Sequence, residues 1–214
     1  MNKKTLVFFF VYCLTVAALF AQKDPKAEAM LNTMSDKYKA YKSFQADFAY
    51  TIESPQEKIK ENMNGTITVK SNKFKLRLGE QEIYNNGTTV WNYLKDDNEV
   101  TITTYSPENG DINPAEIYNI YKKGYKYGFA EDAEEAKTHD VIDLTPENRN
   151  QSIFKVRLVL DKKTKELKSW KIFEKNGRRF VYNISKFVPN VNVKDADFNF
   201  DKAKYPGVSE ISLK

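Results

Sequence analysis

The side chains that could perform acid-base or nucleophilic chemistry are few in this sequence. Such chemistry needs a nucleophile, a titratable base and a group that orients the base, all within hydrogen-bond reach. The chain has one histidine, His139, and one cysteine, Cys13. No serine lies in a glycine-flanked elbow, and no glycine-rich phosphate loop is found. We therefore expect neither a catalytic site nor a cofactor, and we interpret His139 as a residue at the start of a strand.

Alternating polar side chains near the C-terminus resemble a calcium-binding loop. They are Asp195, Asp197, Asn199 and Asp201. An EF-hand loop requires glycine at its sixth position and a carboxylate at its twelfth, where this sequence has Phe200 and Pro206. We therefore expect no metal site. The alternation with Phe198 and Phe200 instead predicts a strand with one solvated face and one apolar face.

The first residues have the pattern of a secretory signal peptide. A short basic region, residues 2–4, precedes an apolar run from Leu6 to Phe20. An uncleaved membrane anchor would need about 20 apolar residues, and this run is shorter. Cys13 lies within the run, so the remaining chain has no cysteine, which fits a bacterial periplasm. We assign 1–21 to the signal peptide and 22–214 to a single domain.

The charge balance does not favour a nucleic-acid partner. The formal net charge of +5 falls by two when Lys3 and Lys4 are removed with the signal peptide. The stretch YKKGYKYGF, residues 121–129, mixes cations and aromatic rings and could stack bases. We interpret it instead as the end of a helix followed by a strand whose lysines extend along apolar surface.

Hydrophobic periodicity predicts one amphipathic helix followed mostly by strands. The segment that Pro25 opens, PKAEAMLNTMSDKYKAYKSF, has apolar residues at steps of three and four. From Phe44 the period changes to two, which is typical of a strand with one buried face. Similar alternation continues to the C-terminus and gives about ten strands. A second helix is predicted from Asn113, whose side chain can cap it, to Gly124, and EDAEEAK at 131–137 is either a solvated loop or a frayed helical turn.

Glycines that follow asparagine mark turns in this pattern. They are Gly65, Gly87, Gly110 and Gly177. We predict hairpin tips at Gly87 and Gly177, because such pairs accept the positive φ angles of tight turns. Strand-like sequence follows Gly65 at once, so we predict a β-bulge there. The sequence predicts a mainly β domain, a strongly curved antiparallel sheet or unclosed barrel whose concave face the helices cover. Periodicity does not decide whether the interior is packed or hollow.

Several stretches resemble the LolA family of periplasmic lipoprotein carriers. They are KSFQADFAYTI at 42–52, GTITVKSNKFKLRL at 65–78, NNGTTVWNY at 85–93, VIDLTPEN at 141–148 and DADFNFDKAKYPGVSEI at 195–211. They follow the family's order across nearly all of the chain after the signal peptide. The resemblance implies an unclosed barrel of about eleven strands, with helices as a lid over a hydrophobic cavity for the acyl chains of lipoproteins.

The resemblance also implies partners and binding residues. The carrier would take acylated lipoproteins from an ATP-driven (ABC-type) exporter in the inner membrane of a Gram-negative bacterium to an acceptor in the outer membrane, where one is present. We expect it to act as a monomer. The expected cavity residues are Phe44, Ala46, Phe48, Phe74, Leu76, Leu78, Val90, Ile102, Ile117 and Tyr118.

The chain departs from the family at one position that matters for the lid. Well-known members have Lys-Arg-Pro ahead of the cavity strand, and that arginine bonds to the lid and helps to govern opening. Here the run is KSNK, residues 70–73, so Ser71 stands nearest the arginine and no guanidinium is present. We expect Lys70 to take part in lid control instead.

Two other functions remain open from the sequence. A lipid or lipoprotein sensor can use the same fold, although such regulators usually add a second domain. A secreted hydrolase is disfavoured, because the sequence lacks the required constellation of side chains.

Overall fold

The computed structural model describes residues 23–106 and 113–213. The expected signal peptide and the Asn-Gly turn at Gly110 lie outside the described residues.

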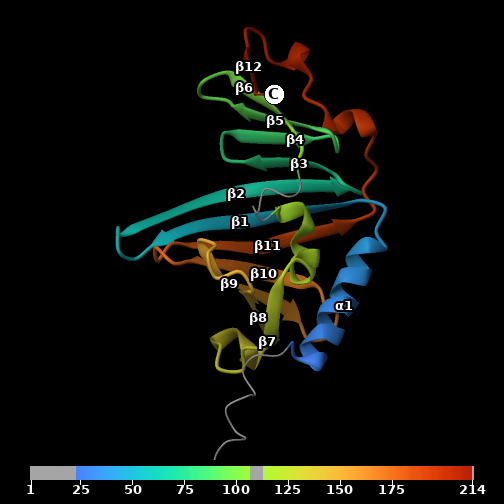
Figure 1. The fold of residues 1–214 in the computed structure, drawn as a ribbon. Coiled ribbons are helices and arrows are strands. Elements are labelled where there is room, and N and C mark those ends of the chain that lie inside the picture. Colours follow the sequence, from blue (N-terminus) through green and yellow to red (C-terminus); the bar gives the residue numbers. More distant parts are fainter. Residues whose placement is uncertain (1–22, 107–112, 214) are drawn as a thin grey trace, which may run out of the picture.

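One sheet of 12 strands forms the body of the molecule (Figure 1). The first half of the chain provides β1 (Phe44–Ser54), β2 (Ile59–Lys70), β3 (Lys73–Leu78), β4 (Gln81–Asn85), β5 (Thr89–Leu94) and β6 (Glu99–Thr104). The second half provides β7 (Tyr125–Phe129), β8 (His139–Pro146), β9 (Ile153–Asp161), β10 (Leu167–Glu174), β11 (Arg179–Pro189) and β12 (Ser209–Leu213). The strand order is β12-β6-β5-β4-β3-β2-β1-β11-β10-β9-β8-β7.

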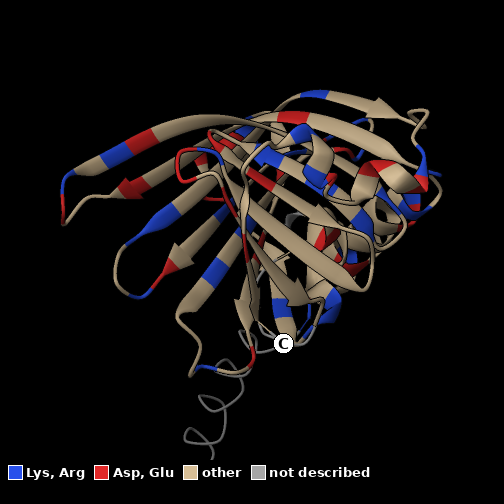
Figure 2. Cartoon of the chain, turned by 90° about the horizontal axis from the view of Figure 1, so that it is seen from above, with Lys and Arg blue, Asp and Glu red and all other residues tan. Residues whose placement is uncertain are grey.

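The sheet is curved but not closed, so the predicted fold class is confirmed. Neighbouring strands are antiparallel except for β12, which pairs with β6 in parallel. The two edges of the sheet are β12 and β7. Basic and acidic residues are interspersed along the strands, in keeping with the small net charge (Figure 2).

Two helical elements pack against the inner face of the sheet, and we call them together the lid. They are the α-helix α1 (Pro25–Lys39) and the 3-10 helix η1 (Pro114–Lys122). Asp24 caps α1 by accepting hydrogen bonds from the backbone N–H groups of Lys26 and Ala27 at 2.8 and 3.2 Å. Asn113 caps η1 in the same way, accepting from the N–H of Ala115 at 2.9 Å. Both helices predicted from these segments are present, although the first ends at Lys39.

The predicted turns at Gly87 and Gly177 are confirmed. Gly87 lies between β4 and β5 with φ of 95°, and Gly177 lies between β10 and β11 with φ of 86°. The acidic stretch contains the short 3-10 helix η2 (Glu134–Lys137), which is the helical turn rather than the loop. His139 begins β8, as expected.

The predicted bulge at Gly65 is wrong. Gly65 lies within β2 in unbroken register, opposite Phe48 on one side and Leu78 on the other. A Cβ atom at this position would lie 2.4 Å from the ring of Phe48. Glycine is therefore needed here because the Phe48 ring crosses directly over the backbone of β2.

The predicted strand near the C-terminus is also wrong. The segment that joins β11 to β12, residues 190–208, contains two short 3-10 helices, η3 (Asp195–Phe198) and η4 (Lys202–Lys204). We call residues 190–208 the C-terminal segment. It crosses the outer face of the sheet, where Phe200 and Tyr205 pack with Tyr93 and Val100. Packing against the sheet has replaced the strand geometry that the alternating pattern favours.

Candidate functional site

The largest apolar cluster of the protein lies between the inner face of the sheet and the lid. Six of the expected cavity residues are in this cluster and are at most 8 % exposed: Phe44, Ala46, Phe48, Phe74, Leu76 and Ile117. Leu78 and Tyr118 are half-buried and pack against it. The alternation of β1 and β3 therefore points one side of each strand inward, as the period of two predicts.

Two expected cavity residues lie outside the cluster. Val90 shares the inner face, because it pairs with Asn85, which pairs in turn with Phe74. Ile102 faces the other way and packs with Tyr93 and Val100 on the outer face. Placing Ile102 on the inner face was wrong, because β6 pairs Thr103, and not Ile102, with Val90. The C-terminal segment buries this part of the outer face, so apolar residues occur on both sides of β5 and β6.

Register shifts bring further apolar side chains into the cluster. β10 shifts its pairing between Leu167 and Ser169, so Leu167 and Trp170 reach the same small space although they are three residues apart. The shift between β1 and β11 at Asp47 and Phe48 likewise turns both Ile184 and Phe187 inward. Period-two reasoning missed Trp170 and Phe187 as site residues for this reason.

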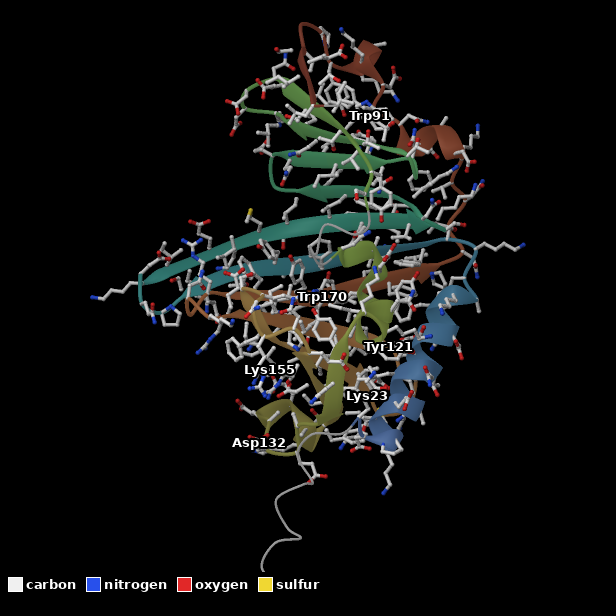
Figure 3. All side chains as sticks on the ribbon, viewed as in Figure 1. Lys23, Trp91, Tyr121, Asp132, Lys155 and Trp170 are labelled. Atoms are coloured by element: carbon white, nitrogen blue, oxygen red, sulfur yellow. The ribbon has the colours of Figure 1, made fainter. Side chains whose placement is uncertain are left out.

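Aromatic rings connect the lid to the sheet. Tyr38 of α1 stacks on Tyr118 of η1 with ring centroids 5.2 Å apart, and it meets Phe44 and Phe187 edge-on at 5.7 and 5.3 Å. Deeper along the same face, Trp170 stacks on Tyr182 at 4.4 Å. Figure 3 shows Trp170 near the middle of this face. These contacts are broad and weakly directional.

Beneath the lid, the apolar side chains fill the inner face in this conformation. The space enclosed by Tyr38, Phe44, Ile117, Trp170 and their neighbours is about 20 Å³. That volume holds about one water molecule. The resemblance implies a hollow, whereas the apolar walls beneath the lid touch one another, so an acyl chain would enter this space only if the lid moved. Farther along the inner face, Tyr50, Ile52, Met63 and Leu78 line an open hollow of about 400 Å³.

Two hydrogen bonds between uncharged side chains join the parts of the lid. The hydroxyl of Ser35 on α1 donates to Asn119 Oδ1 on η1 at 2.7 Å. The hydroxyl of Tyr121 on η1 donates to Asn32 Oδ1 on α1 at 2.6 Å. Figure 3 places Tyr121 between the two helices. No sequence pattern indicates these pairs, because their partners are far apart along the chain.

Lys70 does not contact the lid, so its expected role was wrong. Its ammonium group lies 2.7 Å from Asp195 Oδ1, and the ammonium of Lys73 lies 2.8 Å from Asp195 Oδ2. Hydrogen bonds from the two lysines lower the pKa of Asp195 to about 2. Both lysines point to the outer side of the sheet, where they attach η3, because β2 and β3 turn Val69 and Phe74 inward instead.

The tyrosine hydroxyls of this apolar cluster carry no charge at neutral pH. Burial raises the pKa of the Tyr38 and Tyr182 hydroxyls. The indole N–H of Trp170 is buried, and no hydrogen-bond partner for it lies among the described residues. An unpartnered buried donor is costly, and it can be satisfied by an acceptor on a bound molecule.

The described part of the chain contains no group of three or more His, Cys, Asp or Glu side chains that could hold a metal ion. Within the same residues, no helix is long and apolar enough to span a membrane.

Known proteins were compared with this chain at the level of sequence and of structure. No curated protein matches it. An uncharacterised conserved protein from Thermus thermophilus shares the fold, with 13% identity and a TM-score of 0.53 over 88% of this chain and 99% of that one. A putative outer membrane lipoprotein-sorting protein domain from Vibrio parahaemolyticus matches with 14% identity and a TM-score of 0.45 over 81% and 97% of the two chains.

A further structure is a MucA/MucB complex from Pseudomonas aeruginosa. It matches with 14% identity and a TM-score of 0.38 over 82% of this chain and 61% of that one. The sequence model of the family described as outer membrane lipoprotein carrier protein LolA matches residues 39–201, which include strands β1 to β11 and η1. This match spans most of the chain, and the protein belongs to the LolA family.

Proposed function

We propose that this protein is a periplasmic carrier that binds the acyl chains of lipoproteins between its lid and the inner face of its sheet. It would receive them from an ABC-type exporter in the inner membrane and deliver them to the outer membrane, without catalysing a reaction. The observation that carries this proposal is the aromatic-rich apolar cluster on the inner face, covered by two helices that are joined through hydrogen bonds of neutral side chains.

Transfer energies explain why such a carrier needs an apolar site. Each methylene group removed from water contributes about 0.8 kcal/mol, so about ten buried methylenes contribute roughly 8 kcal/mol. A neutral hydrogen bond contributes only about 0.5–1.5 kcal/mol, so the two bonds that join α1 and η1 together contribute roughly 1–3 kcal/mol. Burial of one acyl chain therefore more than offsets the loss of these two hydrogen bonds, and the chain would also replace apolar contacts that the lid makes with the sheet.

The filled space beneath the lid is compatible with this proposal if the acyl chain takes the place of the lid's own side chains. Tyr118 is half-buried and stacks on Tyr38, so its removal from Phe44 would open the space next to Trp170. The apolar walls would then contact the acyl chain instead of each other. The N–H of Trp170 could donate to the ester or amide carbonyl of the chain, which would satisfy the buried donor.

Site-specific photo-crosslinking tests the location of the cargo. A photoreactive phenylalanine analogue would replace Tyr118 on the inner face, and Trp91 would be replaced in a matched control. Trp91 is also a half-buried aromatic residue, but it packs on the outer face. After expression in a Gram-negative periplasm, mass spectrometry should find acylated peptides attached at position 118 and none at position 91.

Other outcomes would contradict the proposal. Equal crosslinking at both positions, or none at either, would show that the inner face does not receive acyl chains. Turnover of a lipid ester by the purified protein would indicate a hydrolase. Capture of a regulatory protein in place of acylated peptides would favour a lipid-responsive sensor on the same fold.

A further inference from the structure

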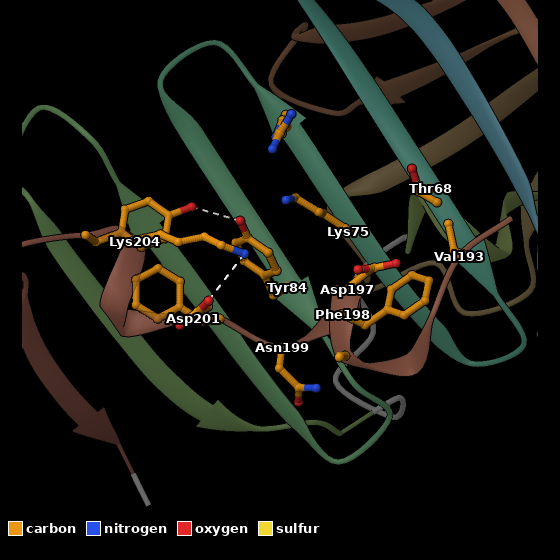
Figure 4. A pocket seen from close by; sticks show the side chains of 13 residues that line it. Thr68, Lys75, Tyr84, Val193, Asp197, Phe198, Asn199, Asp201 and Lys204 are labelled. Carbon is orange, nitrogen blue, oxygen red and sulfur yellow. Dashed lines mark hydrogen bonds and ion pairs between the residues drawn. The ribbon is translucent and has the colours of Figure 1, made fainter. Parts of the chain in front are cut away.

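A second pocket lies on the outer face of the sheet, on the side away from the lid. Its volume is about 780 Å³, which is within the usual range of small-molecule sites. The floor consists of Thr68 on β2, Lys75 and Arg77 on β3, and Tyr84 on β4. The wall is the C-terminal segment between η3 and η4 (Figure 4). The pocket lies between this segment and the strands, and Lys75, Arg77 and Tyr84 face it from the sheet.

Lys75 is the cation of this pocket that has no ion-pair partner among the described residues. It is half-buried, and its ammonium group lies 4.5 Å from the centre of the Tyr84 ring. Among the residues that the structure describes, no carboxylate oxygen lies within 4.0 Å of Lys75 Nζ. Burial and the nearby Arg77 lower the pKa of this ammonium. Figure 4 shows Lys75 and Lys204 converging on the space beside Tyr84.

The other cations at the pocket already have acidic partners. Arg77 Nε lies 3.5 Å from Glu82 Oε1, and Lys204 Nζ lies 3.3 Å from Asp201 Oδ2. Lys204 and Asp201 are both largely exposed, so their pair contributes little to stability, whereas Glu82 is the less exposed partner of Arg77. Lys75 is therefore the cation of the pocket that remains for direct pairing with a ligand. A second negative charge on that ligand would face Asp197 and Asp201, which also line the pocket.

The wall beside these charges is aromatic. Phe200 and Tyr205 stack with ring centroids 4.5 Å apart and an interplanar angle of 19°. Phe200 also meets the ring of Tyr84 edge-on at 5.8 Å. Phe200 and Tyr205 are half-buried, so a further ring can pack against them.

We infer that this outer pocket binds an amphipathic organic monoanion. Its carboxylate pairs with the Lys75 ammonium, and its ring packs against Phe200 and Tyr205. The single cation without an ion-pair partner selects one negative charge, and the neighbouring aspartates disfavour a dianion such as a phosphate monoester. The site is separated from the inner face by the sheet, so it does not depend on the acyl-carrier proposal.

Isothermal titration calorimetry with 3-phenylpropanoate tests this inference, with the uncharged 3-phenylpropanamide as the matched ligand. We expect the acid to bind with a Kd on the order of 1 mM or lower and the amide to bind at least about tenfold more weakly. Lys75→Gln should weaken binding of the acid by about tenfold or more. The control is Lys95→Gln, since Lys95 is an exposed lysine paired with Glu80 at 3.0 Å, away from the pocket.

A short peptide ending in phenylalanine, with a free or an amidated C-terminus, distinguishes two sources of the carboxylate. Binding of the free-acid peptide assigns the site to chain termini, whereas binding of 3-phenylpropanoate alone assigns it to small acids, and both support the inference. It is overturned if no acid binds, if acid and amide bind equally, or if Lys75→Gln binds as the unmodified protein does.

Discussion

The hydrogen bond between Ser35 and Asn119 provides a direct test of how the lid is held. Ser35 is 0% exposed, and its hydroxyl donates to Asn119 Oδ1 at 2.7 Å. Asn119→Ala removes the acceptor and leaves a fully buried hydroxyl without a partner. Ser35→Ala instead removes the buried donor and leaves the amide of Asn119, which is half-buried and can bind water. We therefore expect Asn119→Ala to open the lid more than Ser35→Ala does.

The two substitutions should change the free energy of lid opening by different amounts. Leaving a buried donor unpaired costs about 1–3 kcal/mol, which corresponds to roughly a 5- to 150-fold change in the open-to-closed ratio. Losing the bond without leaving a buried group unpaired costs about 0.5–1.5 kcal/mol, or roughly 2- to 12-fold. The sheet is not perturbed by either change, because both side chains belong to the lid.

Amide hydrogen exchange measures this opening locally. Within and next to η1, the N–H of Glu116 donates to Asn113 O at 3.0 Å and the N–H of Lys123 to Ile120 O at 2.9 Å. Exchange of these amides should accelerate by the factors above, while amides of β9 keep their protection. Thr33→Ala is the matched control, since it removes an exposed hydroxyl of α1 that bonds only to Ala29 O within the same helix.

Either of two results would show that the bond between Ser35 and Asn119 does not hold a separately moving lid. If Asn119→Ala and Thr33→Ala gave the same exchange rates in η1, the bond to Ser35 would not hold the lid. If β9 lost protection together with η1, opening would be global unfolding and no separate movement of the lid would exist.

Three further predictions concern other parts of the molecule. Gly65→Ala should destabilise the fold by about 1–3 kcal/mol in urea titrations, because the new Cβ would lie 2.4 Å from the Phe48 ring. The control Gly128→Ala should not destabilise it, because no atom lies within 4 Å of its new Cβ. Equal urea midpoints for the two variants would contradict the close approach of Phe48 to Gly65. The pKa of Asp195, about 2, lies below its unfolded value near 3.9, so its contribution to attaching η3 is present above about pH 4 and is lost as pH falls toward 2. NMR titration should show its midpoint rising toward about 3.9 when Lys70 and Lys73 are both replaced by alanine, and an unchanged midpoint would exclude the pairing. Trp170→Phe should weaken binding of an ester-linked acyl chain by roughly 2- to 12-fold more than it weakens binding of a plain alkyl chain. Displacement of a fluorescent ligand measures both affinities. An equal loss for the two ligands would mean that the indole N–H does not contact the carbonyl.

The sequence predicted the inner face where strands keep their alternation. Phe44, Ala46 and Phe48 point inward because apolar and polar residues alternate in this part of β1 and only one face of the strand is buried. The same reasoning failed at Ile102, since the pairing register of β6 decides its direction and the C-terminal segment buries the opposite face as well. A pattern of apolar residues within one strand carries no information about which of two buried faces it joins.

The contacts that hold the lid and the C-terminal segment could not be predicted for another reason. Register shifts in β10 and β11 bring Trp170 and Phe187 inward, and such shifts depend on pairing between strands distant in sequence. The hydrogen bond of Ser35 joins it to a residue 84 positions away. We expected Lys70 at the lid because other family members have an arginine at the position that Ser71 occupies here, whereas the alternation of β2 turns Lys70 outward.

The pairing of β1 with β11 at the centre of the sheet determines when the protein can fold. Phe44 pairs with Pro189, so this ladder of ten residue pairs joins the first strand of the sheet to the last strand but one in the sequence. The hairpins of β2–β6 and of β7–β10 are local and can form as the chain emerges, but β1 gains its second neighbour only after β11 has emerged as well. Until then an 11-residue strand presents an unpaired edge, which is a site for aggregation. The emergence of the C-terminal part of the chain therefore governs the yield of native protein, and a chain that stalls before β11 becomes a substrate for chaperones or proteases.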